Sequence, residues 1–408
     1  MAEPKQIPNA LRVVMIVIAV AVIATMVYAT FVTPPKTMRP TVSPAQGLAR
    51  LALPPGFHIE LYASVPSARQ MASGPNGTLF VGTRIANGSV YAVPDRDHDG
   101  KADGVIELVT GLNTPNGVAV RDGALYVAEI PRILRIDNVE TKLAPHAKFK
   151  VVYDKLPTDP HHGWKYIKFG PDGWLYVPIG APCNVCVSPD ARFASLMRIK
   201  PDGTGLESYA KGIRNTVGFD WDPRTHELYF TDNGRDWLGD DIPCDELDYA
   251  PHPGMNFGFP YRWGDNQIDK DFGDKAPAGM EFTPPALCLG PHVAALGMKF
   301  YTGEMFPKQY KNDVFVCEHG SWNRSKKIGY RVMHIGFKNG KPATYEPFIT
   351  GFLAGDQPST NKSFNFGSLN SSGEPWGRPV DVLQMPDGAL MISDDHSGSI
   401  YRVTYKAP

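Results

Sequence analysis

The sequence carries almost no excess of charge, because 41 basic residues balance 42 acidic ones over 408 residues. Nothing in that balance favours nucleic acid or an acidic surface as a partner. The chain also lacks a Gly-x-Gly-x-x-Gly run after a predicted strand, and it lacks a Walker loop. These absences argue against a nucleic-acid-binding protein and against an enzyme that uses nicotinamide cofactors or nucleotide phosphates.

Cysteine is scarce, with five residues in the chain, and its spacing argues against two further kinds of site. Cys183 and Cys186 form a C-x-x-C motif, but Val187 stands where a c-type haem site needs histidine. No second pair of ligands with zinc-site spacing is evident. In an exported protein we therefore expect a local disulfide in this motif. Of the remaining three cysteines, Cys244 and Cys288 could form a second disulfide. Cys317 is expected to be a thiol buried in an apolar strand.

One long apolar run lies near the N-terminus. Residues 13–32 contain no charged side chain, and a helix of that length, at about 1.5 Å per residue, spans a hydrocarbon core of about 30 Å. Lys5 and Arg12 precede the run, which favours a cytoplasmic segment 1–12 and export of the remainder. We expect a retained transmembrane anchor; a signal peptide cleaved near residues 27–29 is the alternative.

The remaining boundaries follow from that anchor. Residues 33–50 contain four prolines and no apolar periodicity, so we expect an extended linker there. Residues 51–408 would then form the exported domain. An inner-membrane anchor would hold this domain in the periplasm, whereas a cleaved leader would release it as a secreted protein.

Glycine and proline are plentiful, at 40 and 38 residues, and many of them fall in one recurring pattern. A turn of Pro, Asp or Asn, and Gly is followed by a short apolar strand, as in residues 171–177. An apolar strand also precedes the turn, so each copy describes a hairpin. Repetition of such hairpins predicts the blades of a β-propeller, with about three or four strands in each. The copies begin at Pro75, Arg121, Pro171, Pro223, Lys311 and Pro386, the fourth and fifth being degenerate.

Two strands at the ends of the repeat have no partner within it. Residues 57–62 precede the first copy, and residues 399–405 are the last strand of the chain. Pairing of the two in one blade would close the ring and remove an exposed edge. We therefore predict an all-β, six-bladed β-propeller preceded by a single transmembrane helix, rather than a β-sandwich with chance turns.

Several candidate site residues occupy the same phase of the repeat. His162 and Arg214 each lie nine residues before the proline of their turn, and Arg378 lies eight before. We interpret these positions as the start of a blade's second strand, at the end opposite the turn. Gly180 and Gly234, which would follow third strands, reach the same face. These residues should converge around one mouth of the axis, the usual place for a ligand.

The residue types at this mouth suit a particular chemistry. A neutral histidine near pH 7 can take the proton of a hydroxyl group. Two arginines can hold a polyanionic cofactor through bidentate hydrogen bonds.

Three motifs, at residues 162–173, 212–215 and 318–325, resemble those of the glucose/sorbosone dehydrogenase family, which uses pyrroloquinoline quinone. Residues 162–173 resemble the segment with the catalytic histidine in the soluble quinoprotein glucose and aldose sugar dehydrogenases. Residues 212–215 resemble that family's Arg-Asn pair, and residues 318–325 resemble the sorbosone dehydrogenase-like branch. The resemblance covers roughly residue 53 to the C-terminus and also implies six blades.

The resemblance implies a role for each matched residue. His162 would be the general base that takes the proton of the sugar's anomeric hydroxyl while hydride passes to the quinone. Arg214 would stabilise the reduced quinone, Asn215 would contact the cofactor, and Arg378 would hold one of its carboxylates. The family's cofactor lysine has no single match, and the candidates are Arg324, Lys326 and Lys327.

The sequence departs from the family's pattern at the metal and at one anchor. The family's calcium takes main-chain oxygens from a Gly-Pro step, which is matched here by Gly234 followed by Arg235. Val380 stands where the family has a second C-terminal arginine, so one cofactor anchor is missing. His161 would take the place of His162 if the register slipped by one residue.

An acidic loop predicts a metal site without reference to any family. Residues 95–103 place carboxylates at loop positions 1, 3, 5 and 9 and glycine at position 6. Hard oxygen donors in this spacing, with the carbonyl of Lys101, suit Ca²⁺. Ile106 stands where an EF-hand has its last glutamate, so the loop is not a full EF-hand. It resembles instead the short cation loops of integrin-type propellers. The alternative is a solvated acidic turn that binds no metal. The expected ligands of a structural calcium ion are Asp95, Asp97, Asp99 and Asp103.

The leading interpretation is a periplasmic quinoprotein oxidoreductase that oxidises a sugar or aldose-type substrate with pyrroloquinoline quinone and calcium. Its electrons would pass to an external acceptor, a quinone or a cytochrome, because the chain has no haem motif. One alternative is a calcium-dependent propeller lactonase or hydrolase, which would need carboxylates around a metal at the axis mouth. Another is a non-enzymatic propeller whose mouth binds a ligand or partner.

Overall fold

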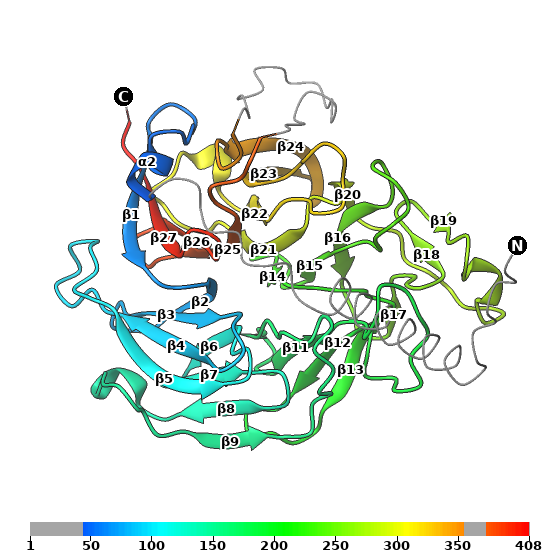
Figure 1. Ribbon diagram of the computed structural model, residues 1–408, viewed down its shortest axis with the longest axis horizontal. Helices are drawn as coiled ribbons and strands as arrows, with labels where there is room; N and C mark the ends of the chain where they lie inside the picture. The colour runs from blue at the N-terminus through cyan, green and yellow to red at the C-terminus, as the bar shows by residue number, and fades with distance from the viewer. Residues whose placement is uncertain (1–43, 355–372, 408) are drawn as a thin grey trace, which may run out of the picture. The chain divides into compact units, whose positions relative to one another are not determined.

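Six antiparallel sheets around a common axis make up most of what the computed structural model describes, residues 44–354 and 373–407 (Figure 1). Each sheet is built on four strands, and the first strands of most neighbouring sheets contact one another around the axis. The chain thus builds its blades from the axis outward. This is the all-β, six-bladed propeller that the repeated turn motif predicts.

The first three blades follow one another along the chain. Blade 1 consists of β2 (Ala68–Ser73), β3 (Leu79–Thr83), β4 (Gly88–Val93) and β5 (Ile106–Leu112). Blade 2 consists of β6 (Gly117–Arg121), β7 (Ala124–Ala128), β8 (Ile133–Ile136) and β9 (Lys150–Tyr153). Blade 3 consists of β10 (Lys168–Phe169), β11 (Leu175–Ile179), β12 (Ser195–Ile199) and β13 (Glu207–Lys211), with β17 (Met255–Asn256) added in parallel.

The last three blades complete the ring. Blade 4 consists of β14 (Phe219–Trp221), β15 (Leu228–Asp232), β16 (Cys244–Ala250) and β20 (Leu287–Pro291). Blade 5 consists of β21 (Ala295–Phe300), β22 (Val314–Glu318), β23 (Arg331–Lys338) and β24 (Lys341–Ile349). Blade 6 consists of β25 (Pro379–Gln384), β26 (Leu390–Asp394), β27 (Ser399–Tyr405) and β1 (Phe57–Ser64).

A few short elements lie outside the blades. The hairpin of β18 (Arg262–Trp263) and β19 (Gln267–Ile268) falls in the long connection between β16 and β20. The short helices are α2 (Pro44–Leu48), η1 (Val139–Thr141), η2 (Gly273–Lys275) and η3 (Lys308–Tyr310).

Blade 6 closes the ring with strands from both ends of the propeller. β1 pairs antiparallel with β27, from Phe57 opposite Tyr405 to Ser64 opposite Ser399. β27 also pairs with β26, so β1 is the outer strand of a blade whose other strands are C-terminal. The predicted pairing of these two segments is confirmed.

The repeated turn joins the first and second strands of a blade. In blade 3 the turn at residues 170–173 lies between β10 and β11. The strand that follows His162 is therefore the innermost strand of its blade, and the prediction of a second strand is wrong. Gly180 and Gly234 likewise follow second strands, not third ones. The position of each strand within its blade shifts by one, because β1, the first strand of the chain, is the outer strand of blade 6.

Buried apolar side chains fill the spaces between successive blades. Between blades 1 and 2, Phe80 and Leu108 pack with Leu125 and Val127. Corresponding clusters lie between each other pair of neighbouring blades, including blades 6 and 1. This packing fixes the strands and so determines where the residues at the strand ends lie.

Ile400 tests the packing at the seam between blades 6 and 1. It is fully buried in β27, opposite Ala63 of β1, and belongs to the apolar cluster between the two blades. Replacing Ile400 by valine is expected to cost about 0.5–1.5 kcal/mol of unfolding free energy, measured by denaturant unfolding. The exposed Glu60 of β1 gives the control, because Glu60→Ala should change stability by less than about 0.5 kcal/mol. No loss in Ile400→Val would contradict a packed seam.

The C-terminal part of the predicted linker packs on the propeller. The predicted transmembrane helix, residues 13–32, and linker residues 33–43 lie outside the described residues. Residues 44–50 are packed on the propeller and are not extended, because Leu48 joins an apolar cluster and the ring of Trp376 lies where a side chain on Gly47 would be. Within residues 44–354 and 373–407, no helix has the length and apolar character needed to cross a membrane.

The cysteines lie as the sequence predicts. Cys183 pairs with Cys186, and Cys244 pairs with Cys288 across β16 and β20. Cys317 is a buried free thiol in β22.

Candidate functional site

One mouth of the propeller receives residues from all six blades. His162, Arg214 and Arg378 precede first strands, and the chain returns to the same end after each second strand. The residues that directly follow second strands are Gly180 and five polar residues: Arg84, Glu129, Asn233, His319 and Asp395. The predicted convergence of strand ends is therefore present, around the innermost strands of the ring.

His162 is buried at this mouth, and its two ring nitrogens differ. Nδ1 lies 2.8 Å from the carbonyl oxygen of Ala181, and because a carbonyl can only accept, Nδ1 carries the proton. Nε2 has no hydrogen-bond partner among the described residues, so it is the basic nitrogen of the neutral ring. Burial, followed by the charge of Arg214, lowers the pKa of His162 well below its usual value. The ring is thus neutral at pH 7.

Gly180 makes room for this histidine. A Cβ on Gly180 would lie only 2.6 Å from the Cβ of His162. His162 also has a φ of 49°, in the left-handed region that is strained for a residue other than glycine. Strain of this kind is common at functional sites, where the surroundings hold a side chain in a required position.

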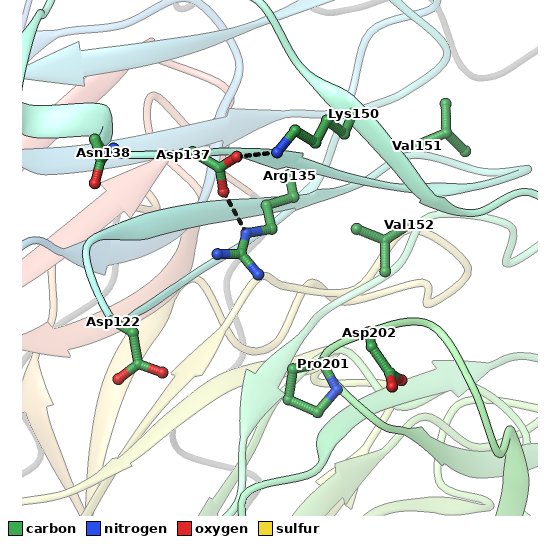
Figure 2. Close-up of a pocket in the computed structure, with 9 residues that line it drawn as sticks. All are labelled: Asp122, Arg135, Asp137, Asn138, Lys150, Val151, Val152, Pro201 and Asp202. Atoms are coloured by element: carbon green, nitrogen blue, oxygen red, sulfur yellow. Dashed lines mark hydrogen bonds and ion pairs between the residues drawn. The ribbon is translucent and has the colours of Figure 1, made fainter.

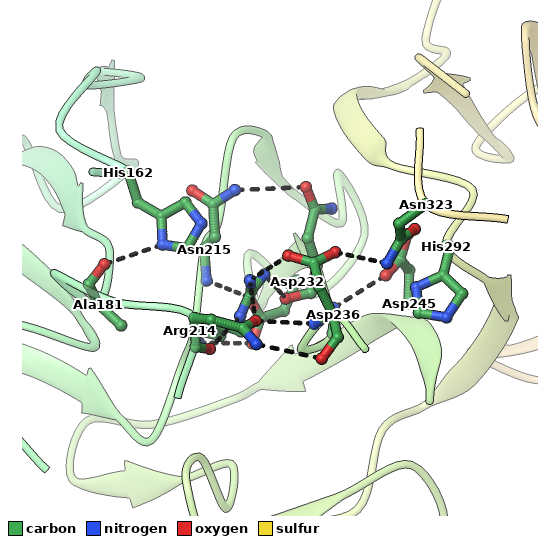
Figure 3. A network of polar contacts seen from close by, with 12 residues as sticks. His162, Ala181, Arg214, Asn215, Asp232, Asp236, Asp245, His292 and Asn323 are labelled. Atoms are coloured by element: carbon green, nitrogen blue, oxygen red, sulfur yellow. Dashed lines mark hydrogen bonds and ion pairs between the residues drawn. The ribbon is translucent and has the colours of Figure 1, made fainter. Parts of the chain in front are cut away.

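Hydrogen bonds hold Arg214 beside His162 (Figure 3). The guanidinium donates to the carbonyl oxygens of Asn184 and Asn233, and to the side chains of Asn184 and Asp236, over 2.8–3.1 Å. These bonds use four of its five N–H groups. Asn184 lies inside the C-x-x-C loop, so the local disulfide constrains the loop that orients this arginine.

Asp232 fixes the backbone of the Arg-Asn pair. Its carboxylate accepts the backbone N–H of Arg214 at 2.8 Å and that of Asn215 at 2.6 Å. Burial raises the pKa of Asp232 to about 6. The side chain of Asn215 donates to Oδ1 of Asn233 at 3.4 Å, so both members of the pair are held by neighbours in blade 4.

A second charged group comes from blades 5, 6 and 1. Asp395 accepts a hydrogen bond from Arg69 at 2.9 Å and lies 2.7 Å from Nε2 of His319. Arg378 donates to the carbonyl oxygens of His319 and Gly320 at 3.0 and 2.7 Å. Burial, with the charge of Arg378, lowers the pKa of His319 to about 3. In the described ranges, Arg378 forms no ion pair with a carboxylate.

Arg84 is a mouth residue that the sequence analysis missed. Its guanidinium lies 3.7 Å from the centroid of the Trp164 ring, and it forms no ion pair with any described residue. Burial lowers the pKa of Arg84 to about 9, so it stays protonated at pH 7. Its charge also lowers the pKa of His162, which places the two at the same mouth. The signal that could have found it is its position directly after a second strand.

A small apolar cluster lies at the starts of the inner strands. Val217, Leu296 and Val380 are buried together, with Trp164 partly buried against them. Val380 stands where the resemblance would place an arginine, and it is only 2 % exposed in this cluster. An arginine there would put a charge among apolar side chains, which explains the departure.

Two of the three candidates for the family's cofactor lysine form ion pairs elsewhere. Arg324 lies 3.3 Å from Asp241, and Lys327 lies 2.9 Å from Glu374. Lys326 is exposed. None of these contacts joins the three residues to the group around His162.

The predicted main-chain calcium ligand lies beside a salt bridge. The backbone N–H of Gly234 donates to Asp245 at 2.8 Å. Arg235, which replaces the family's proline, pairs with Asp269 at 2.7 Å and Asp271 at 3.0 Å. The replacement therefore has a structural partner of its own in the insertion between β16 and β20.

Three buried carboxylates on β15 and β16 form a cluster that the sequence did not predict. Oxygens of Asp232, Glu246 and Asp248 lie within 4.8 Å of one another, and Asp232 stands opposite Glu246 in the strand register. Both carboxylate oxygens of Asp248 are buried with no hydrogen-bond partner among the described residues. Burial and mutual repulsion raise the pKa values of Glu246 and Asp248 well above the usual range. A cavity of about 20 Å³ beside Asp232 and Glu246 has room for about one water molecule or ion.

The acidic loop between β4 and β5 brings three of its four predicted ligands together. Oxygens of Asp95, Asp97 and Asp99 lie within 4.8 Å of one another. Asp103 instead accepts hydrogen bonds from the backbone and guanidinium of Arg96, at 2.9 and 3.2 Å. The prediction of Asp103 as a fourth ligand is therefore not reproduced.

A surface hollow of about 530 Å³ lies between blades 2 and 3, at the turn end of the propeller (Figure 2). Asp137 forms ion pairs with both Arg135 and Lys150 in its wall. Asp122, from the turn motif, also lines the hollow, which places it at the end opposite His162. Its charged groups largely neutralise one another, and the mouth around His162 remains the better candidate.

Comparison with known proteins adds a family and relatives. The family described as a domain of unknown function, DUF7133, matches residues 43–403. An uncharacterized protein of Borreliella burgdorferi is 33% identical over 380 residues, which cover 90% of this chain and 94% of that protein. The aldose sugar dehydrogenase YliI of Escherichia coli is 26% identical over 280 residues, which cover 63% of this chain and 64% of that enzyme.

Solved structures show the same fold. The holo form of the pyranose dehydrogenase PQQ domain from Coprinopsis cinerea superposes with a TM-score of 0.70 at 16% identity, covering 91% of this chain and 99% of that domain. At that identity the likeness establishes the propeller and leaves the chemistry to be argued from the residues.

Proposed function

We propose that this chain, which belongs to the DUF7133 family, is an oxidoreductase that oxidises an aldose-type sugar at its anomeric carbon with pyrroloquinoline quinone as cofactor. The observation that carries this proposal is a neutral histidine with an open Nε2, at a mouth that also holds two arginines without carboxylate partners. The relatives support it, because they include an aldose sugar dehydrogenase and the PQQ domain of a pyranose dehydrogenase.

The residues at the mouth fit a planar polyanion. Arg84 and Arg378 would hold its carboxylates, because each guanidinium lacks an ionic partner among the described residues. The apolar cluster of Val217, Leu296 and Val380 would lie against its rings. When bound, pyrroloquinoline quinone supplies the quinone group that accepts a hydride.

His162 would take the proton of the anomeric hydroxyl at Nε2. The carbonyl of Ala181 holds the proton on Nδ1, which fixes the required tautomer. Burial and the charge of Arg214 keep the ring uncharged, so the base is ready at pH 7. The C–H electron pair would leave with the hydride and the hydroxyl proton would pass to Nε2, so that an aldose becomes its lactone.

Arg214 and Asn215 would mainly set the geometry of this site. With four N–H groups engaged, Arg214 has one left to donate to a reduced quinone. Its positive charge still acts at the mouth, as the lowered pKa of His162 indicates.

Calcium, which the resemblance also implies, has a suitable donor set in Asp232, Glu246 and Asp248. The two buried, unpartnered oxygens of Asp248 support this assignment, because a buried carboxylate without donors is costly. The ion would fasten β15 to β16 beneath the Arg-Asn pair. The carbonyl of Gly234 stays a predicted ligand for the same ion.

We also propose where the enzyme works and what it passes electrons to. The propeller would act in the periplasm, tethered to the inner membrane by residues 13–32, and its electrons would leave to an external quinone or cytochrome. The two disulfides support an oxidising compartment.

The test is turnover by the reconstituted full-length protein. Purified protein would be mixed with pyrroloquinoline quinone and Ca²⁺, and a dye acceptor would report oxidation across a set of aldoses, including aldehyde-form sugars. We expect dye reduction with at least one sugar and none when the quinone is left out. Bound quinone with no turnover on any sugar would favour a ligand-binding propeller.

A further inference from the structure

The loop between β4 and β5 combines clustered carboxylates with a buried oxygen that lacks a donor. Oxygens of Asp95, Asp97 and Asp99 lie within 4.8 Å of one another. Asp95 is only 8% exposed, and its Oδ1 is buried with no hydrogen-bond partner in residues 44–354 and 373–407. Its Oδ2 accepts the backbone N–H of Gly100 at 3.1 Å. A buried carboxylate oxygen with no donor needs a cation or incurs a desolvation cost.

The other two carboxylates leave oxygens available on the solvent side. Asp97 uses Oδ1 to accept the backbone N–H of Asp99 at 3.3 Å, and Asp99 uses Oδ1 to accept that of Lys101 at 2.8 Å. The Oδ2 of Asp99 lies 3.8 Å from the exposed ammonium of Lys101, a solvent-exposed ion pair that a calcium ion would replace. Both side chains are exposed, so water can complete the six to eight oxygen ligands of a calcium ion. Within the described chain, Asp95 forms no ion pair with lysine or arginine, so its buried oxygen has no protein cation beside it.

The loop lies across the seam where the ring closes. A Cβ on Gly100 would meet Nη2 of Arg402, in β27 of blade 6, at 2.9 Å. Arg402 is itself paired with Asp387 in the turn of blade 6. A Cβ on Gly77, in the turn of blade 1, would meet Nδ1 of His98 at 2.9 Å. The loop therefore touches blade 1 on one side and blade 6 on the other.

Tyr62 of β1 lies in the apolar cluster between blades 6 and 1. Its hydroxyl is buried without a hydrogen-bond partner in the described residues. Burial, and then the charge of Asp95, raise the pKa of Tyr62 to about 12. The charges of Asp95 and of Arg402 thus both act on the strand that closes the ring.

We propose that Asp95, Asp97 and Asp99 bind a calcium ion that fastens this loop across the seam between blades 1 and 6. This site is separate from the mouth around His162 and from the carboxylates on β15 and β16. Its role is to stabilise ring closure, because the ion binds the folded loop and not the unfolded chain.

The experiment compares wild-type full-length protein, without quinone, with the double variant Asp97→Asn/Asp99→Asn. Calcium should raise the melting temperature of the wild type by roughly 2–5 °C more than it raises that of the double variant, which keeps only the carboxylates on β15 and β16. Calorimetric titration with Ca²⁺ should show one site fewer per chain in the variant. Asp103→Asn is the matched control and should keep the shift, because its carboxylate already bonds to Arg96.

Hydrogen exchange of backbone amides would show which strands calcium stabilises. Calcium should slow exchange of the β1 and β27 amides in the wild type and leave those amides unchanged in the double variant. Both carboxylates are exposed, so the variant should fold, and normal quinone binding by it would confirm that the mouth is intact. Equal calcium stoichiometry and equal thermal shift in the two proteins would overturn the site. Protection confined to the loop would overturn its role in closure.

Discussion

Replacing His162 by alanine is expected to lower sugar turnover by about 10²-fold or more, the usual contribution of a general base. Binding of pyrroloquinoline quinone should change little, because Nε2 is proposed to act on the substrate hydroxyl. Steady-state dye reduction would measure turnover, and a quinone titration would measure binding. His161→Ala is the matched control, since His161 neighbours His162 and should tolerate the change.

The pH profile separates a base from a structural role. Because burial and Arg214 lower the pKa of His162, the neutral base persists well below pH 6.5. Wild-type kcat/KM should therefore hold steady as the pH falls through 6.5 and decline only at lower pH, as Nε2 becomes protonated. That acid limb should vanish from the residual activity of His162→Ala. If His161→Ala lost the activity and His162→Ala kept it, the register would have slipped and the assignment would be contradicted.

Arg84→Ala and Arg378→Ala should each weaken binding of pyrroloquinoline quinone by about 10- to 150-fold, which corresponds to the loss of a charge-assisted contact of about 1.5–3 kcal/mol. Neither arginine has a carboxylate partner among the described residues, so each substitution should leave no carboxylate unpaired. Turnover at saturating cofactor should fall far less than affinity. Absorbance titration of the quinone would give both dissociation constants.

Lys327→Ala supplies the matched comparison for these arginines. Lys327 pairs with Glu374, so its removal should leave quinone affinity close to that of the wild type. An affinity loss in Lys327→Ala as large as that in Arg378→Ala would mean that the lysine, as the resemblance implies, reaches the cofactor. Unchanged affinity in both arginine variants would contradict the anion site.

The fold was predictable because each blade carries a recognisable turn sequence between its first two strands. Each Pro-Asp-Gly copy marks a hairpin, and the unpaired strand at residues 57–62 indicated how the ring closes. The position of each strand within a blade was not predictable, since a circular repeat has no natural starting point. Only the order of strands within the sheets, with β1 at the outer edge of blade 6, shows that the strand after His162 is the innermost one.

The site was predictable only in part, for reasons of register and packing. His162, Arg214 and Arg378 share a phase of the repeat, so the sequence could place them at one end. Arg84 shares no motif with them and reaches the mouth because the chain turns back after β3. The proximity of Asp232 to Glu246 depends on cross-strand register, which the sequence does not record.

The most direct measurement is a titration of purified, quinone-free full-length protein with pyrroloquinoline quinone in the presence of Ca²⁺, followed by the absorbance of the quinone. We predict saturable binding of one quinone per chain that weakens in Arg84→Ala and Arg378→Ala and survives in His162→Ala. No binding by the wild-type protein, even at high Ca²⁺, would contradict the oxidoreductase and leave a propeller whose mouth binds some other ligand.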